Sequence, residues 1–200
     1  MSAVSQSSLF QEAGWALGGT WRLLTGRDEA RAYFDFSQRG LAGSFVPLVL
    51  AAVVLVGFIG LGAGSTGVSP ATQIFVLGAI AVLRYSALRV ILPRLGALDA
   101  FRPAMVASNW ASAILFAAIV PVTFGTAFVG ALVLGPASGT TLVSFILTLW
   151  AALGLALVAI EVNILRIVAR LRATEIVLVL AAQFFAILAG LYIISRLFQG

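Results

Sequence analysis

The stretch from Leu142 to Arg172, LVSFILTLWAALGLALVAIEVNILRIVARLR, decides the fold class. It carries no charged residue before Glu161, and about 20 apolar residues in a helix are enough to cross the hydrocarbon core of a bilayer. The helical pattern then continues through a polar and basic segment that contains Glu161, Asn163, Arg166, Arg170 and Arg172. We therefore expect one helix that spans a membrane and leaves it as a basic segment reaching Arg172.

The composition extends this expectation to the whole chain of 200 residues. Hydrophobic residues make up 62% of the chain and charged residues only 10%, whereas soluble proteins average about 25% charged residues because their surface faces water. The net charge of +5 comes from arginines near the ends of apolar segments, a pattern typical of membrane topology rather than of a nucleic-acid surface. We expect the lipid bilayer as a partner and no nucleic acid.

The side chains that most catalysis requires are missing from the sequence. There is no cysteine and no histidine, which excludes disulfides, thiol nucleophiles and the usual zinc sites. A serine nucleophile would need a histidine or lysine as its base, and Glu161 has no second carboxylate beside it in the apolar segments. We therefore expect no catalytic, metal-binding or cofactor-binding residues, and a protein that is not an enzyme.

Residues 1–40 predict an amphipathic arm that lies on the membrane surface before the first long apolar segment. Its first helix is interrupted by glycines, which weaken the helix prediction: Gly14, Gly18 and Gly19. The expected interfacial anchors are Trp15, Trp21 and Arg22. A second short helix is expected over residues 28–38. Two interpretations of the arm stay open: it binds a partner or senses lipid, or it only orients the first span.

Residues 41–200 contain five segments long enough to cross a bilayer. The expected spans cover about 41–61, 71–92, 104–121, 142–163 and 175–195. The third segment stays apolar beyond Pro121 as far as Leu134, either as a kinked continuation or as a half-helix. The predicted fold class is an all-α membrane protein, a bundle of five transmembrane helices with an N-terminal interfacial amphipathic segment.

The distribution of arginine predicts the orientation of the chain. Four arginines precede the first span and four lie in Arg84–Arg102, from the end of the second span to the start of the third, whereas none lies in the loops between the first and second or the third and fourth. Three more follow the fourth span and one follows the fifth. Because cytoplasmic loops carry the excess of basic residues, we expect an integral protein of the bacterial inner membrane with its N-terminus in the cytoplasm and its C-terminus outside.

Six polar residues fall within the apolar segments, all in the half of the bilayer nearest the cytoplasm. They are Arg84, Arg89, Asn109, Glu161, Asn163 and Gln183. A charge at the bilayer centre costs about 2.5–3.5 kcal/mol on insertion scales, so we expect Glu161 to pair with Arg84 or Arg89. The cluster is either a cytoplasm-facing pocket for an ion, a proton or a small ligand, or a set of groups paired between helices or reaching the headgroups.

Three short motifs accompany this layout of spans: Trp21-Arg22-Leu23-Leu24, Phe34-Asp35 and Arg102 with Asn109-Trp110. Through these motifs and its layout the chain resembles the Yip1-like superfamily of small bacterial polytopic membrane proteins, which have about five spans after a cytosolic N-terminal segment. The resemblance implies a non-enzymatic membrane protein with a cytosolic arm.

Three functions are compatible with the sequence. The first is membrane organisation or partner binding through the arm Leu9–Gln38 and the segments Arg84–Arg102 and Arg166–Arg172. The second is a small transporter or channel that uses the polar cluster, although no acid lies at mid-span. The third is an accessory subunit of a membrane complex, because small residues such as Ala107 and Ala111 permit close approach in a homo-oligomer or with another membrane protein.

Overall fold

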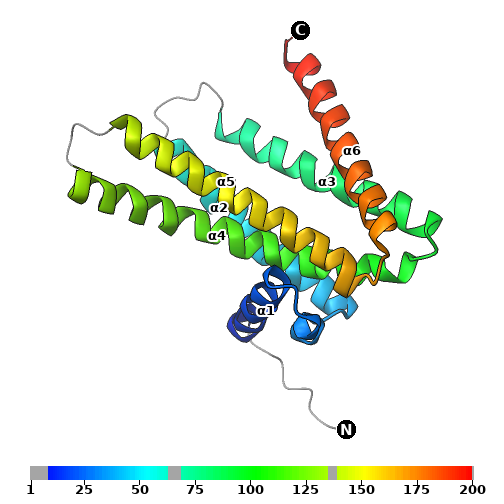
Figure 1. Ribbon diagram of the computed structural model, residues 1–200. Helices are drawn as coiled ribbons and strands as arrows, with labels where there is room; N and C mark the ends of the chain where they lie inside the picture. Colours follow the sequence, from blue (N-terminus) through cyan, green and yellow to red (C-terminus); the bar gives the residue numbers. More distant parts are fainter. Residues whose placement is uncertain (1–8, 63–68, 135–138, 200) are drawn as a thin grey trace.

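The computed structural model describes residues 9–62, 69–134 and 139–199, and within these ranges its regular secondary structure consists of helices joined by short turns. The elements are α1 (Leu9–Leu24), η1 (Asp28–Tyr33), α2 (Gln38–Gly62), α3 (Pro70–Arg94), η2 (Leu98–Ala100), α4 (Phe101–Leu134), α5 (Gly139–Asn163), η3 (Ile164–Val168) and α6 (Ala173–Gln199). Five of the helices, α2 to α6, are long and apolar enough to cross a membrane (Figure 1). The predicted bundle of five transmembrane helices is therefore confirmed.

The third span is one helix from Phe101 to Leu134, and Pro121 lies inside it. Residues 122–134 thus continue the span and do not form a separate half-helix. A proline is tolerated at this position because neighbouring groups in a membrane bundle can satisfy the backbone carbonyl that it leaves without a partner. α3 begins with a side-chain cap, since Ser69 Oγ accepts a hydrogen bond of 3.1 Å from the backbone N–H of Thr72, and Pro70 occupies the first helical turn.

The prediction of one helix running from the fourth span through Arg172 is wrong. α5 ends at Asn163 and is followed by the π-helical turn η3, in which the N–H of Ala169 donates to the carbonyl of Ile164 at 2.9 Å. Arg170 then adopts a left-handed conformation with φ of 56°, which stops the helix. The wide turn buries the four side chains Ile164, Leu165, Ile167 and Val168 in the core. Arg170 and Arg172 consequently lie in the turn before α6.

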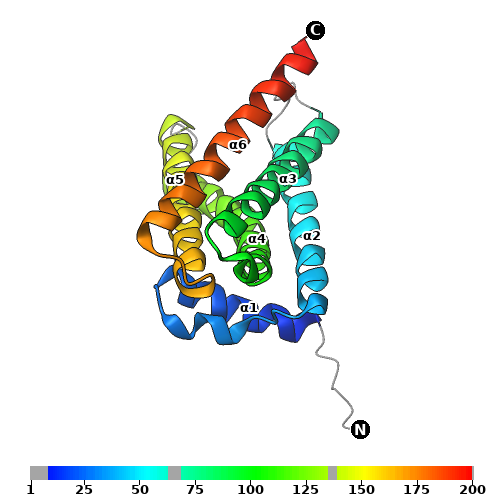
Figure 2. The same cartoon turned by 90° about the vertical axis from the view of Figure 1, so that its right-hand side faces the viewer.

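The spanning helices pack in two groups. α2, α4 and α5 lie side by side, whereas α3 packs mainly on α6, and these two helices diverge from the first group (Figures 1 and 2). The first half of α4 is the centre of the molecule, because every residue from Ala104 to Ala113 is buried. Four of these ten side chains are alanine, including Ala107 and Ala111, so neighbouring helices can approach α4 closely.

The arm lies across α4 and α5 at one end of the bundle, which we call the inner end (Figure 2). Leu23 and Ala16 of α1 are buried there. Of the three glycines in this helix, Gly19 allows close packing, since a Cβ on Gly19 would lie 2.7 Å from the ring of Phe34. The expected second helix is shorter than predicted: η1 ends at Tyr33, Phe34 is extended, and α2 begins at Gln38.

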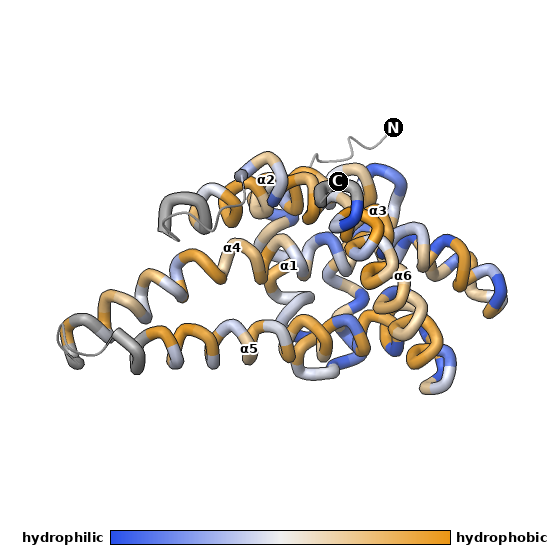
Figure 3. The backbone as a smooth tube through the Cα atoms, turned by 90° about the horizontal axis from the view of Figure 1, so that it is seen from above, coloured by the Kyte–Doolittle hydropathy of each residue, from blue (hydrophilic) through white to orange (hydrophobic). Residues whose placement is uncertain are grey.

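Hydrophilic residues gather around the arm and the inner ends of the helices, while the parts of α4 and α5 farthest from the arm are mostly hydrophobic (Figure 3). Large apolar side chains point outward along the spans, as on Phe128, Leu155 and Phe185, each more than half exposed. Because an outward-facing apolar surface of this extent fits a lipid environment, the bundle has the surface of an integral membrane protein.

Candidate intramembrane polar site

All five spanning helices contribute polar side chains to one network in the inner half of the bundle. The contributing residues are Ser44 of α2, Arg84 and Tyr85 of α3, Ser108 and Asn109 of α4, Glu161 of α5 and Gln183 of α6. The network lies where α3 and α6 meet the group α2, α4 and α5.

Glu161 is the centre of one branch of this network. Its Oε2 pairs with the guanidinium of Arg84 and accepts a hydrogen bond of 3.0 Å from Ser108 Oγ. Its Oε1 accepts a longer bond of 3.4 Å from Gln183 Nε2. The Glu161 side chain is only 12% exposed and that of Arg84 24%. Since a polar group in an apolar bundle is costly unless it is hydrogen-bonded, these three contacts satisfy the Glu161 carboxyl group within the bundle.

Asn109 is the centre of the second branch. Tyr85 OH donates to its Oδ1, and its Nδ2 donates to Ser44 Oγ at 2.9 Å. Ser44 in turn donates to the carbonyl of Leu41 at 2.8 Å. Asn109 is 2% exposed, so the branch satisfies buried polar groups of α2, α3 and α4 at once. The branches are joined through the backbone, because Arg84 precedes Tyr85 and Ser108 precedes Asn109.

The structure brings together four of the six residues predicted for the polar cluster. Arg84, Asn109, Glu161 and Gln183 belong to the network, and of the two predicted partners of Glu161 it is Arg84 that forms the ion pair.

The other two predicted residues lie elsewhere. Arg89 is exposed and places its guanidinium 5.4 Å from the ring centre of Phe101. Asn163 donates a hydrogen bond of 2.8 Å to the carbonyl of Leu23, so it fastens the arm to α5. Arg166 does the same through a bond of 2.9 Å to the carbonyl of Gly26. The basic end of the fourth span therefore serves in part to hold the arm.

Three members of the network were not predicted: Ser44, Tyr85 and Ser108. Each has an ordinary role in an apolar helix, since serine can bond to the backbone of its own helix and tyrosine is frequent near membrane interfaces. The usable signal is that Tyr85 and Ser108 stand next to Arg84 and Asn109 in the sequence. Because adjacent residues on a helix face different directions, two adjacent polar residues on an apolar helix can bond to two different neighbouring helices.

The expected interfacial anchors divide into two kinds. Trp15 and Trp21 are exposed on α1, at 59% and 60%. Arg22 instead packs within the arm, where its guanidinium carbon lies 4.1 Å from the ring centre of Tyr33 and its Nη1 donates to the carbonyl of Gly18 at 3.1 Å. Of the three expected anchors, the two tryptophans are thus the ones placed to contact lipid or a partner.

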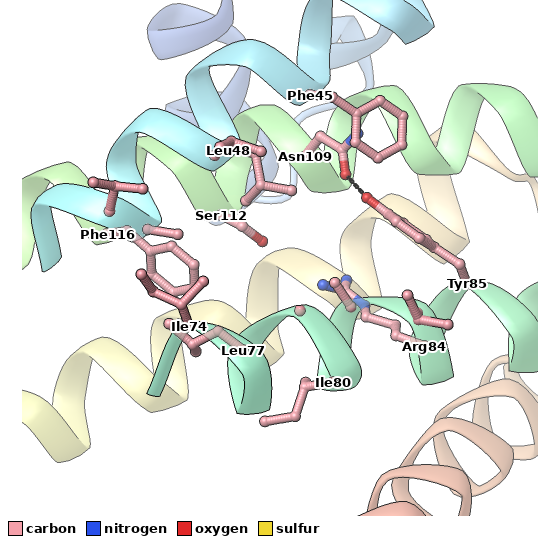
Figure 4. Close-up of a pocket in the computed structure, with 16 residues that line it drawn as sticks. Phe45, Leu48, Ile74, Leu77, Ile80, Arg84, Tyr85, Asn109, Ser112 and Phe116 are labelled. Atoms are coloured by element: carbon pink, nitrogen blue, oxygen red, sulfur yellow. Dashed lines mark hydrogen bonds between the residues drawn. The ribbon is translucent and has the colours of Figure 1, made fainter. Parts of the chain in front are cut away.

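An apolar crevice of about 350 Å³ adjoins the network between α2, α3 and α4 (Figure 4). Most of its lining is hydrocarbon, including Phe45, Leu77 and Phe116. At its inner end it reaches the polar side chains Arg84, Tyr85, Asn109 and Ser112. The site as a whole can therefore hold a neutralised ion pair in the bundle and offer hydrogen-bond donors to a molecule in the crevice.

No family model matches the chain, and no curated protein or solved structure matches it either.

Proposed function

We propose that the chain is a non-enzymatic membrane protein of Yip1-like type that organises the membrane at its cytoplasmic face. In this proposal the protein resides in the bacterial inner membrane with its arm inside the cell. The contact surface consists of the arm, Leu9–Gln38, and the arginine-bearing segments Arg84–Arg102 and Arg166–Arg172.

The observation that carries the proposal is the exposed apolar stripe on α1. Phe10, Leu17 and Trp21 recur at helical spacing, and they are exposed at 89%, 57% and 60% although the opposite face of α1 is buried against the bundle. An amphipathic helix with this pattern lies in the membrane interface with its apolar face in the acyl boundary. Because Asn163 and Arg166 fasten the arm to the bundle, the stripe is held at a fixed place beside the spans.

The charges at the inner end support the same function. Among ion pairs between described residues, Arg84–Glu161 is the one present, so the other inner arginines are not neutralised by such a pair. Unpaired arginines near the surface attract anionic lipid, at about 1 kcal/mol for each basic residue. The arm and these arginines together would hold anionic lipid around the inner end of the bundle.

The polar network favours this role over a carrier for ions or protons. Glu161 already has three partners within the bundle, and a carrier would need the carboxylate to exchange them for its cargo. The same contacts serve well as a structural link between α3, α4, α5 and α6.

Tryptophan quenching in lipid vesicles tests the proposal. A Trp15→Phe/Trp110→Phe/Trp150→Phe variant retains Trp21 of the stripe as its only tryptophan, since the chain has four. We expect lipids with a quencher near the headgroup to quench its emission strongly, and aqueous iodide to quench it weakly. A variant that retains Trp110 alone is the control, because this side chain is 6% exposed and should escape iodide. Strong iodide quenching of the arm would contradict membrane organisation and favour a soluble partner instead.

A further inference from the structure

The crevice between α2, α3 and α4 has the size and chemistry of a ligand site. Its volume of about 350 Å³ lies within the range of roughly 300–1,000 Å³ that is usual for small-molecule pockets. Pockets of this kind are mostly apolar, with a few polar groups that orient the ligand. Here the polar groups are confined to one end, which suits a molecule with one polar head and one apolar chain.

The crevice opens toward the lipid side of the bundle. Val49 and Val53 of α2 line it, as do Ile74 and Val82 of α3, and all four are about half exposed or more, from 49% to 62%. These four residues lie on α2 and α3, between which the crevice opens. A ligand would therefore enter sideways from the bilayer, so it must itself be soluble in lipid.

The inner end of the crevice favours a head without charge. Arg84 is the only charged residue of the lining, and its charge is balanced by Glu161 behind it. An anionic head would add an uncompensated negative charge to an apolar site next to Glu161, at a large desolvation cost. A neutral head avoids this cost and can still use the hydrogen bonds on offer.

The groups that can form these hydrogen bonds with the head are the donors of Arg84 and Ser112. Both bonds of Arg84 leave from Nη2, and a guanidinium has five N–H donors in all. Ser112 Oγ has no hydrogen-bond partner within the described part of the chain, although the residue is 8% exposed. The two side chains point toward one another from α3 and α4 (Figure 4). An acceptor oxygen placed between them would bind to both.

We propose that this crevice binds a neutral lipid whose head carries a carbonyl oxygen and whose tail is a single flexible hydrocarbon chain. The carbonyl accepts hydrogen bonds from Arg84 and Ser112, and the chain lies along Leu77 and Phe116 toward the edge of α2 and α3. A quinone with an isoprenoid or alkyl tail and a fatty acyl ester both supply this chemistry. The inference goes beyond the role proposed for the inner face, which needs no ligand in the crevice.

Equilibrium binding to the full chain in phosphatidylcholine nanodiscs tests the inference, with radiolabelled methyl palmitate as the probe and a decyl-substituted benzoquinone, palmitate and hexadecane as competitors. We expect the ester to bind saturably and the benzoquinone to displace it. Palmitate and hexadecane should compete about tenfold more weakly, because neither carries a neutral hydrogen-bond acceptor. The stronger of the ester and the quinone identifies the source of the ligand. Equal competition by hexadecane would show that the crevice takes any hydrocarbon chain, and tighter binding of palmitate would show a site for anions. Either result overturns the proposal.

Two substitutions locate the binding without breaking the Arg84–Glu161 pair. Gly78 lines the crevice and a Cβ there meets nothing within 4 Å, so Gly78→Leu should fill the space and abolish binding of the ester. Gly125→Leu is the matched control, since that Cβ also meets nothing within 4 Å and Gly125 is not in the lining. Ser112→Ala should weaken the ester about fivefold and leave hexadecane unchanged. Undiminished ester binding by Gly78→Leu would place the ligand elsewhere and refute the assignment.

Discussion

Arg84 of α3 and Glu161 of α5 lie 77 positions apart in the sequence and form an ion pair between the two groups of spanning helices. Ser108 and Gln183 complete the coordination of the carboxylate from α4 and α6. The pair therefore links the two groups of helices through polar contacts. Such contacts matter in a membrane because the hydrophobic effect gives little driving force for helix association, since lipid is as apolar as the helix surfaces.

Removal of one partner of this pair should destabilise the bundle strongly. We expect Glu161→Gln or Arg84→Gln to lower the free energy of unfolding by roughly 3–5 kcal/mol, because each leaves the remaining partner of the pair without its counter-charge in the apolar interior. The apparent Tm in detergent, followed by circular dichroism, measures the loss. The double substitution should cost less than the sum of the two single ones, since it removes both charges. Strictly additive losses would mean that the two side chains do not interact.

The second branch of the network makes a smaller contribution. Asn109→Ala removes the partner of both Tyr85 and Ser44, and we expect it to cost roughly 1–3 kcal/mol because these groups are then left unsatisfied. Thr148→Ala on α5 is a suitable control, because Thr148 is exposed and bonds only to the backbone of its own helix. The same melting experiment applies. Equal stability of Asn109→Ala and Thr148→Ala would disprove the importance of this branch.

Gly19→Ala should release the arm, because the new Cβ would lie 2.7 Å from the ring carbons of Phe34. Gly14→Ala is the matched control on the same helix, since nothing lies within 4 Å of that Cβ, and it should stabilise α1 by about 1 kcal/mol. Limited proteolysis between α1 and α2 reports on docking. We expect faster cleavage of Gly19→Ala and unchanged or slower cleavage of Gly14→Ala; the opposite order would rule out the packing of Phe34 on Gly19.

The contact between α3 and α6 depends on Gly190, where a Cβ would collide with the side chain of Leu83. We expect Gly190→Ala to lower the apparent Tm by an amount typical of overpacking, about 1–3 kcal/mol. Leu83→Ala combined with Gly190→Ala should recover part of the loss, because it removes the colliding methyl groups. If the second substitution only added to the damage, Gly190 and Leu83 would not be neighbours in the membrane.

The architecture was predictable because its signals are local. The length and apolar character of each span follow from the sequence alone, and the end of α3 and the start of α6 lie within two residues of the expected positions. The ion pair was predictable in kind, since few groups inside a membrane can neutralise Glu161. The choice of Arg84 over Arg89 depends on how α3 packs on its neighbours, which no periodicity encodes.

Other features depend on contacts between distant segments. The helix after Asn163 stops at Val168 because the π-helical turn buries apolar side chains in the core, whereas the continuing pattern of apolar and basic residues also fits a longer helix. Gly19 is unfavourable for a helix by itself, and the positions of Phe34 and Tyr33 explain why a larger residue would not fit. The crevice likewise results from the divergence of α3 from α2, which the sequence of neither helix reveals.

The most direct test of the account is the location of the arm and of the C-terminal end relative to the membrane. The chain has no cysteine, so Thr25→Cys in the arm and Gly200→Cys at the end of the chain each introduce a single thiol. We predict that a membrane-impermeant maleimide added to intact cells labels Gly200→Cys at once and labels Thr25→Cys only after the cells are permeabilised. Labelling of both variants in intact cells, or of neither, would place the two ends on the same side and contradict a five-span protein with its arm inside.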